Sequence, residues 1–446
     1  MAAHTRRVPQ RDAAAAEETE SVPFFDESRV PMETIELPVP RIEGLEAEEF
    51  EVIGQKVTHR LAQRPGGYVI LKYVRPVVKR RDTESIHCPP APAGVIEASR
   101  ADVSFLAGLL IDKFLWHLPL YRQHQRLEQA GIRVSRPWLT QLTQQTIGFL
   151  EPIYDAQFDS IRASRLRAMD ETPIKAGRTE RGKMRTAYFW AVYGEHNEVC
   201  FPYCPSREAA NVYAALGADP ASGSVRLTAG YAAYASYAKK VGITHAQCWA
   251  HARRELFEAE ASDPEGVREG LRRIAKIYEI EEDIRAQRLT GEVKRLHRLT
   301  HSKPHVEGFF AWVDHKLEEH GLRPTTPFIA ALNHARERRA GLEVFLTDPE
   351  APPDTNHLER ALRAVPMGRK NWNFCWTELG AEHLGIVQSL IVTCRLHGID
   401  PYTYLVDVLQ RVGQHPASRV AELTPRLWKQ YFAADPLRSA LHTLAA

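Results

Sequence analysis

The chain has 446 residues, which predicts roughly two to four packed units at about 100 to 200 residues per domain. Hydrophobic residues make up 44% and charged residues 26%, which excludes a fibrous repeat and a wholly disordered chain. No stretch approaches the roughly 20 apolar residues of a membrane span, and no signal peptide is recognisable, so we expect a cytoplasmic protein that makes no contact with membranes. The net charge of +2 is uninformative about partners, which leaves only local clusters of charge to consider.

The N-terminal 98 residues divide into two segments. Residues 1–45 lack periodicity, which predicts a disordered or loosely attached segment. In residues 46–98, β-branched and aromatic residues alternate with charges around Pro65-Gly66-Gly67, which predicts a β-hairpin. This hairpin is expected to be basic, because its sequence contains a cluster of cationic residues with no acid among them: Lys56, Arg60, Arg64, Lys72, Arg75, Lys79, Arg80 and Arg81.

Residues 99–160 have helical periodicity. The sequence predicts a helix from Leu120 to Ala130, a turn at Gly131, and a second helix capped by Ser135. This arrangement is typical of a helix-turn-helix, whose second helix enters a DNA groove. A plain helical hairpin that serves as scaffold is an equally good interpretation. The candidates for DNA contact on the second helix are Arg136, Gln141 and Gln144.

Residues 161–255 are expected to mix strands with one helix. Strands are predicted up to Asp170 and over 186–193, 199–204, 225–227 and 243–248, with a helix over 207–216. Three consecutive strands, a helix and a further strand are the order of a ribonuclease-H-like α/β core with a mixed sheet. Apolar residues at helical spacing predict an α-helical insertion over 256–349. Residues 350–395 then complete the core, and residues 396–446 form a C-terminal tail.

Two carboxylates are candidate metal ligands. Phosphoryl transfer on DNA uses two divalent cations, and carboxylate oxygens hold such ions. Asp170 stands at the end of the first core strand, although Asp is common in turns after strands and is a weak signal alone. Glu359 follows Asn356 by three residues, a spacing that a helix-capping pair explains without any function, and the two roles are compatible.

A basic stretch interleaved with aromatic residues follows Glu359. Such a stretch suits phosphate contacts and base stacking. A solvated helix face with tryptophans in the core explains the same composition equally well. The candidate DNA-binding residues here are Arg360, Arg363, Arg369, Lys370 and Trp372.

Seven short motifs, taken together, identify a family. They are His117-Leu-Pro-Leu-Tyr-Arg122, Met169-Asp-Glu-Thr-Pro173, Gly230-Tyr-Ala-Ala-Tyr234, Cys248-Trp-Ala-His-Ala-Arg-Arg254, Asn356-His-Leu-Glu-Arg-Ala-Leu-Arg363, Gly368-Arg-Lys-Asn-Trp372 and His397-Gly-Ile-Asp-Pro-Tyr402. The chain closely resembles transposases of the insertion sequence 66 family. The resemblance runs from about residue 100 to about residue 430 in the family's order, and the set is far more specific than any single motif.

The resemblance implies a DDE-type DNA transposase that cleaves transposon ends and joins them to target DNA. It implies Asp170 as the first acid and Glu359 as the last, both as ligands of Mg²⁺ or Mn²⁺, with two ions expected. The acid between them stands just before Gly-Tyr-Ala-Ala-Tyr in such families, and Ala229 occupies that position here. Because a methyl group cannot ligate a cation, we expect this copy to be inactive or impaired.

Two explanations for Ala229 are open. Either the alanine was introduced to stop cleavage while preserving DNA binding, or the copy decayed naturally, and the intact surrounding motifs favour the first. Glu171 and Asp219 are imaginable replacements, but Glu171 points away from Asp170 because side chains alternate along an extended segment. The alternative function is a non-catalytic, sequence-specific DNA-binding protein derived from a transposase.

Cys248 and His251 form a Cys-x-x-His pair that needs separate weighing. No second pair lies at zinc-like spacing, so a zinc site is not expected. Related transposases carry a similar motif near the active site, which implies that His251 positions the scissile phosphate or the first acid, with simple packing as the alternative. Arg253 and Arg254 beside it are further candidates for DNA contact.

The resemblance also bears on partners. Family members resemble one another in a cysteine-rich zinc module near the basic hairpin, of which this chain keeps only Cys88. The hairpin is therefore expected to contact double-stranded DNA through charge alone. Since transposition pairs two transposon ends, we expect a homodimer or a larger synaptic complex.

Overall fold

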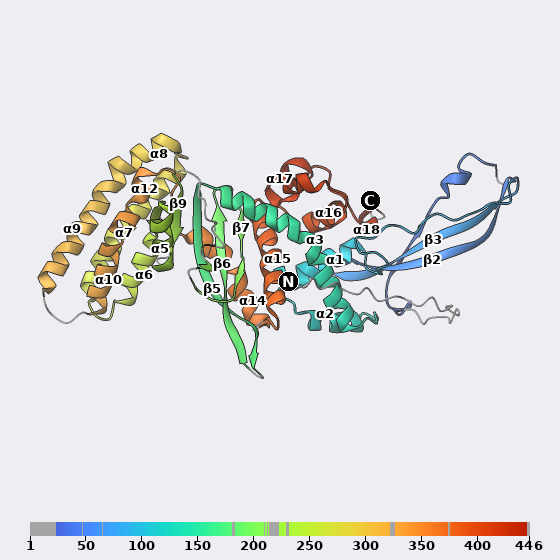
Figure 1. The fold of residues 1–446 in the computed structure, drawn as a ribbon, viewed down its shortest axis with the longest axis horizontal. Helices are drawn as coiled ribbons and strands as arrows, with labels where there is room; N and C mark the ends of the chain where they lie inside the picture. The colour runs from blue at the N-terminus through green and yellow to red at the C-terminus, as the bar shows by residue number, and fades with distance from the viewer. Residues whose placement is uncertain are drawn as a thin grey trace, which may run out of the picture.

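The computed structural model describes most of the chain: residues 24–46, 48–64, 66–180, 183–208, 210–211, 213, 223–228, 232–321, 326–372 and 375–443. The molecule is elongated, with a β-sheet arm at one end, a helical bundle at the other and a mixed sheet flanked by helices between them (Figure 1). Among the described helices, none combines the length and the apolar character that crossing a lipid bilayer requires.

The arm is the predicted β-hairpin extended by two further strands. Its strands are β1 (Met32–Glu36), β2 (Phe50–Arg64), β3 (Gly67–Arg80) and β4 (Ile86–His87). Strands β2 and β3 are antiparallel around Gly66, whose positive φ of 86° suits glycine, and β1 pairs in parallel with β3. The prediction that residues 1–45 are disordered or loosely attached is wrong for residues 24–45, because Phe25 and Val30 are buried in the main core and β1 adds to the sheet. Residues 1–23 lie outside the described residues.

The helical segment after the arm follows the sequence prediction closely. It contains α1 (Val103–Leu110), the π-helical turn η2 (Ile111–Leu115), α2 (Leu120–Gln129) and α3 (Arg136–Ala163). Gly131 takes a positive φ of 90° in the turn between α2 and α3. The Ser135 hydroxyl accepts a hydrogen bond from the Trp138 amide at 3.3 Å, which caps α3. The predicted helices, turn and cap are therefore present.

The central sheet is mixed and has six strands. They are β5 (Leu166–Glu180), β6 (Lys183–Gly194), β7 (Val199–Cys200), β8 (Tyr203–Cys204), β9 (Val225–Thr228) and β10 (Thr244–Gln247). The order is β10-β9-β5-β6-β7, with β8 also paired to β6. Strands β9 and β10 run parallel to β5, whereas β6 is antiparallel to it. The structure is therefore a mixed α/β fold.

Two strand predictions need correction. The first core strand does not end at Asp170 but continues for ten residues to Glu180, because β6 pairs along its whole length. The predicted strand 199–204 is split into β7 and β8 at Phe201 and Pro202, since proline has no amide hydrogen to donate to a ladder. Half of the predicted helix 207–216 lies outside the described residues.

Helices cover both faces of the sheet. Helix α5 (Ala232–Val241) packs Tyr234 and Tyr237 against Met169 and Trp190 on one face. On the other face lie α13 (Asn356–Leu362), α14 (Ala364–Trp372) and α15 (Glu378–Leu396), which share a core with the alternate residues of β5 and β6. Because side chains alternate along a strand, Asp170 belongs to this second face.

The predicted helical insertion has its own hydrophobic core. It begins before the predicted residue 256, with α6 (Trp249–Glu258), and continues with α7 (Pro264–Ala286), α8 (Gly291–His297), η3 (Arg298–Ser302), α9 (Lys303–His320), α10 (Pro327–Glu337), α11 (Arg339–Leu342) and α12 (Val344–Thr347). This core forms around Trp249, Phe309, Phe310 and Leu332, separate from the main core.

The predicted C-terminal tail, residues 396–446, contains several helical segments. They are α16 (Pro401–Arg411), η4 (Ala417–Leu423), α17 (Pro425–Tyr431) and α18 (Ala440–Thr443). Tyr404, Leu405 and Trp428 are buried in the main core, and Leu441 packs against Ala62 and Leu71 at the base of the arm. Apolar residues at helical spacing bury these segments against α1, α3 and the arm.

Candidate active site

Asp170 lies on β5 opposite Ala191 of β6. One of its carboxylate oxygens, Oδ1, accepts a hydrogen bond from the Glu171 amide at 2.8 Å. The pKa of Asp170 is raised to about 6, mainly by burial and also by the nearby charges of Glu171 and Glu359, against the lowering effects of that amide and of Arg254. A carboxylate in such a place is stabilised by a positive charge.

Glu359 lies in the first turn of α13, facing Asp170. The predicted capping pair is wrong in its register: Thr355 is the N-cap residue, and Asn356 is the first residue of the helix, where its side chain donates to Asp354 at 2.6 Å. The Thr355 hydroxyl lies 3.4 Å from Oε1 of Glu359. The Glu359 side chain is 28% exposed, so it is open to solvent on one side.

His251 lies in the first turn of α6, on the third element that reaches this point. Its Nε2 is 3.8 Å from Oε1 of Glu359, and the side chain is 18% exposed. Burial lowers the pKa of His251. The other ring nitrogen, Nδ1, is buried and has no hydrogen-bond partner among the described residues.

These three side chains converge on one point. One ligand atom from each of Asp170, His251 and Glu359 lies within 4.8 Å of the other two. In the part of the chain that the structure describes, no other group of three histidine, cysteine or acidic residues is close enough to hold a metal ion. The convergence joins a strand of the sheet, the first helix of the insertion and the helix that follows the insertion.

Cys248 and Thr355 hold the starts of α6 and α13 together. The Cys248 sulfur accepts from the Thr355 amide at 3.3 Å and lies 3.2 Å from the Thr355 hydroxyl. The Trp249 amide donates to the Pro353 carbonyl at 2.9 Å. Cys248 thus contacts Thr355 while His251 faces the carboxylates, so the two residues of the Cys-x-x-His motif have different partners. Sequence reasoning missed Thr355, which carried no recognisable motif.

Ala229 lies outside the described residues, as does Asp219. The last described residue of β9, Thr228, pairs with Met169, and each stands one residue before Ala229 and Asp170 in the chain. Glu171 points to the opposite face of the sheet from Asp170, as predicted. There it accepts a hydrogen bond from the Tyr234 hydroxyl at 2.6 Å and pairs with Arg207.

The predicted DNA-binding residues near the site have several different surroundings. Arg254 pairs with Oε2 of Glu359 at 3.4 Å. Arg369 donates to the Pro173 carbonyl on β5. The side chains exposed on α6, α13 and their flanks are Arg253, Arg360, Arg363 and Lys370, and the side chain of Trp372 lies outside the described part.

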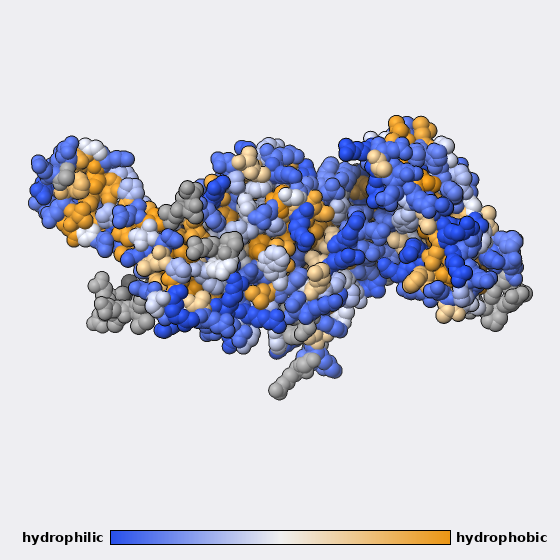
Figure 2. All heavy atoms as spheres, turned by 180° about the vertical axis from the view of Figure 1, so that it is seen from behind, coloured by the Kyte–Doolittle hydropathy of each residue, from blue (hydrophilic) through white to orange (hydrophobic). Residues whose placement is uncertain are grey.

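The basic residues predicted on the hairpin are only partly free to bind a ligand. Arg60 donates to the Pro92 and Ala93 carbonyls, and Arg75 donates to the Pro89 carbonyl at 3.2 Å. Lys79 and Arg80 form ion pairs with Glu84 and Asp82. Lys56 and Arg81 are exposed, Lys72 is half-buried, and the Arg64 side chain lies outside the described part. Figure 2 also shows hydrophobic surface on the arm, where Val52, Ile53, Val57 and Ile86 are exposed.

The predicted recognition helix presents its candidates to solvent. Arg136, Gln141 and Gln144 are exposed on α3, while Leu139 and Leu142 between them are buried. Sequence reasoning missed three exposed cations on the extension of β5 and β6, namely Lys175, Arg178 and Arg185, of which Arg185 pairs with Glu378. Arg178 stacks 4.0 Å from the ring centre of Trp376, which is 59% exposed. These residues escaped notice because the strand was expected to end at Asp170.

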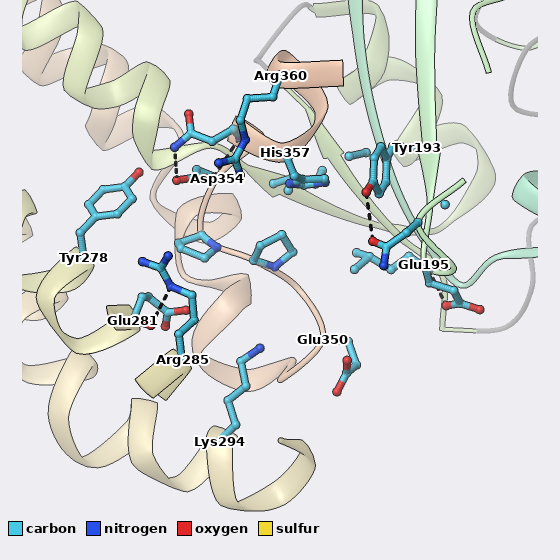
Figure 3. Close-up of a pocket in the computed structure, with 18 of the residues that line it drawn as sticks. Tyr193, Glu195, Tyr278, Glu281, Arg285, Lys294, Glu350, Asp354, His357 and Arg360 are labelled. Atoms are coloured by element: carbon cyan, nitrogen blue, oxygen red, sulfur yellow. Dashed lines mark hydrogen bonds between the residues drawn. The ribbon is translucent and has the colours of Figure 1, made fainter. Parts of the chain in front are cut away.

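A cavity of about 490 Å³ lies beside the site, between the sheet and the insertion. In Figure 3, Tyr278, Glu281, Arg285 and Lys294 line it from the insertion, and Tyr193 and Glu195 from the sheet. His357 and Arg360 reach it from α13, whereas Glu359 does not line it. The cavity carries both signs of charge and is distinct from the convergence of Asp170, His251 and Glu359.

Comparison with known protein families decides what the site belongs to. The sequence model described as "Transposase IS66 family" matches residues 98–383, well over half of the chain, and the "IS66 C-terminal element" matches residues 389–426. The chain belongs to the IS66 transposase family. The family implies DNA transposition as the process, DNA as the partner and a DDE-type nucleic-acid-processing enzyme, a class that usually uses a divalent metal.

Curated relatives of this IS66 transposase come from Sinorhizobium fredii. The uncharacterized protein y4hP is 30% identical over 417 residues, which cover 87% of this chain and 73% of that protein. The uncharacterized protein y4qI is 29% identical over 411 residues, covering 88% of this chain and 74% of y4qI. The similarity therefore covers most of this chain.

Proposed function

We propose that this IS66 transposase binds divalent cations through Asp170 and Glu359 on a ribonuclease-H-like core and uses them to cleave transposon ends and join them to target DNA. The observation that carries the proposal is the convergence of these two carboxylates, which are far apart in the chain, with ligand atoms within 4.8 Å. The strand order β10-β9-β5-β6-β7, with β9 and β10 parallel to β5, supports the ribonuclease-H-like assignment.

The residues fit a divalent cation of the Mg²⁺ or Mn²⁺ type. Asp170 is largely buried, and among the described residues no cationic side chain forms an ion pair with it, so its charge requires a counterion. Glu359 uses Oε2 for Arg254 and leaves Oε1 toward the convergence. When bound, such cations activate the attacking oxygen and stabilise the leaving oxygen of a phosphoryl transfer.

Other residues of the chain would position the metal-binding carboxylates and supply positive charge for DNA phosphates. Arg254 holds the Glu359 carboxylate from one side, and the Cys248–Thr355 contact fixes the helix that carries it. The exposed Arg363 and Lys370 beside α13 are placed to bind phosphates of DNA. Ala229 removes one carboxylate ligand from the site, so this copy is inactive or impaired in cleavage while its DNA contacts persist.

We further propose that different segments of the chain have different roles. The α2–α3 hairpin and the exposed cations of the arm bind the transposon end, the segments 161–255 and 350–395 form the catalytic core, and the insertion 256–349 braces it. The exposed Arg136, Gln141 and Gln144 on α3 support the first assignment. Two copies or more would pair the two ends of the element.

The test is cleavage of a labelled duplex that carries a transposon end, with Mg²⁺ or Mn²⁺ and with chelator as the blank. Because a lost ligand removes several kcal/mol of transition-state stabilisation, Ala229→Asp should raise cleavage by about 100-fold or more. Adding Asp170→Asn to that variant should abolish the gain without weakening DNA binding in a gel-shift assay. Cleavage that survives Asp170→Asn would refute the assignment of this carboxylate.

The methyl group at position 229 also supports a second candidate, a DNA-binding protein that recognises ends without cutting them. Under this alternative, Ala229→Asp binds the labelled end with unchanged affinity and produces no cut. The same assay therefore separates the two functions. In both cases binding should weaken steeply as salt rises, because phosphate contacts release counterions.

A further inference from the structure

We propose that His251 is itself a metal ligand, so that this chain holds one divalent cation through Asp170, His251 and Glu359 and prefers Mn²⁺ over Mg²⁺. The inference rests on the proposed function of the carboxylate pair and goes beyond it. It assigns to an imidazole the third protein ligand in a chain whose sequence has alanine at position 229.

The geometry of the three side chains supports a shared cation. Two ligands of one small divalent cation at about 2.1 Å lie about 3 to 3.6 Å apart. The distance from Nε2 of His251 to Oε1 of Glu359 is 3.8 Å, slightly longer than this spacing and too long for a hydrogen bond.

The free atoms of the site point the same way. Glu359 engages Arg254 with Oε2, while its Oε1, which accepts from the Thr355 hydroxyl at 3.4 Å, lies on the side of His251. Asp170 engages the Glu171 amide with Oδ1. The converging atoms are thus lone-pair donors from two carboxylates and an imidazole, a set that is repulsive until a cation lies between them.

Backbone and side-chain hydrogen bonds set the distance between His251 and Glu359. Its amide donates to the Cys248 carbonyl at 3.2 Å in the first turn of α6. Cys248 in turn accepts from the Thr355 amide at 3.3 Å, four residues before Glu359. Hydrogen bonds therefore join the N-terminus of α6 to the N-terminus of α13. From these two helix ends, His251 and Glu359 project toward Asp170.

The ligand set predicts the metal. Carboxylates alone suit Mg²⁺, whereas a nitrogen ligand shifts preference toward transition-series ions such as Mn²⁺. Removing the nitrogen should weaken Mn²⁺ binding by about 10-fold or more and should affect Mg²⁺ binding much less.

The experiment uses the full chain, stripped of metal and titrated with MnCl₂. Free Mn²⁺ is followed by electron paramagnetic resonance, and the bound ion is examined by electron spin echo envelope modulation for a directly coordinated ¹⁴N. We expect one bound Mn²⁺ with a ¹⁴N signal that His251→Ala abolishes. The matched control is His334→Ala, a similarly half-buried histidine on α10, which should leave the signal intact. His251→Gln provides a second variant, and thermal melting checks that each protein is folded.

The outcomes distinguish failure of the His251 assignment from failure of the proposed function on which it rests. A ¹⁴N signal that persists in folded His251→Ala overturns the ligand assignment. Bound Mn²⁺ without ¹⁴N, lost in Asp170→Asn and Glu359→Gln, overturns it as well but leaves the carboxylate site standing. Failure of the wild-type chain to bind Mn²⁺ at millimolar concentration overturns both.

Discussion

Arg298 offers the sharpest test of how the insertion supports the active site. This arginine is fully buried at the start of η3 and forms a bidentate pair with Glu281 of α7, with both N–O distances at 2.7 Å. Its Nη1 also donates to the carbonyls of Phe345 at 2.8 Å and Ala351 at 3.0 Å. One side chain therefore joins α7 to the loop that leads into α13 and Glu359.

Replacing Arg298 with methionine keeps most of the side-chain volume and removes every donor. Glu281, 8% exposed, then loses its partner, and breaking a buried ion pair from one side costs about 3 to 5 kcal/mol. The orphaned carbonyls add to this cost. The control is Arg295→Met, because Arg295 pairs with Glu292 at the surface and such a pair is worth about 0.2 to 1 kcal/mol.

The assay is urea denaturation followed by tryptophan fluorescence, since Trp249 and Trp312 report on the core of the insertion. The double variant Arg298→Met with Glu281→Gln should recover part of the loss, because no charge is then buried without a partner. A cleavage assay in the Ala229→Asp background should show a further loss when Arg298 is replaced. Free energies of unfolding for Arg298→Met and Arg295→Met that agree within about 1 kcal/mol would refute the reasoning.

Three further predictions concern packing, the tie beside the site and pH. A methyl group at Gly385 would stand 2.3 Å from the Phe201 carbonyl, so Gly385→Ala should destabilise the protein by about 1 to 3 kcal/mol or more in urea, and a neutral result would contradict the close approach of α15 to the sheet. Thr355→Val removes the hydroxyl near Cys248 and should cost about 0.5 to 1.5 kcal/mol and weaken Mn²⁺ binding, whereas unchanged binding would show that the tie does not position the ligands. Burial, reinforced by a nearby arginine, lowers the pKa of His245 to about 4 in the folded protein, below the unfolded value near 6.5. The contribution of neutral His245 to the free energy of unfolding is therefore intact above pH 6.5 and falls by about 3 kcal/mol in total as the pH drops toward 4. A His245→Gln variant with the same acid sensitivity as the wild type would contradict that assignment.

The elements that depend on local pattern were predictable from the sequence. Ser135 caps α3 and Gly131 turns the chain before it, because capping and positive φ are decided within a few residues. The hairpin of β2 and β3 and the helices of the insertion follow from alternation and from helical spacing for the same reason. The family followed from motifs whose order survives along the chain.

Elements that depend on a distant partner were not predictable. Strand β5 continues past Asp170 because β6 pairs with it, and the segment before the arm is ordered because β3 offers β1 an open edge. Half of the basic residues predicted on the hairpin form hydrogen bonds or ion pairs with neighbouring residues of the arm. The sequence does not reveal which carbonyls or carboxylates will lie beside a charged residue.

The sequence by itself determined the family and predicted Asp170 and Glu359 as the acids of the site. The sequence implied a role for His251 beside the first acid, whereas only the tertiary structure decided its distance from Glu359 and the contact of Cys248 with Thr355. The physical reason is that the site draws one residue from a strand, one from the first helix of an insertion and one from a helix beyond it. Spacing along the chain describes each of these helices alone, whereas the packing of α6 against the start of α13 sets the distance between their side chains.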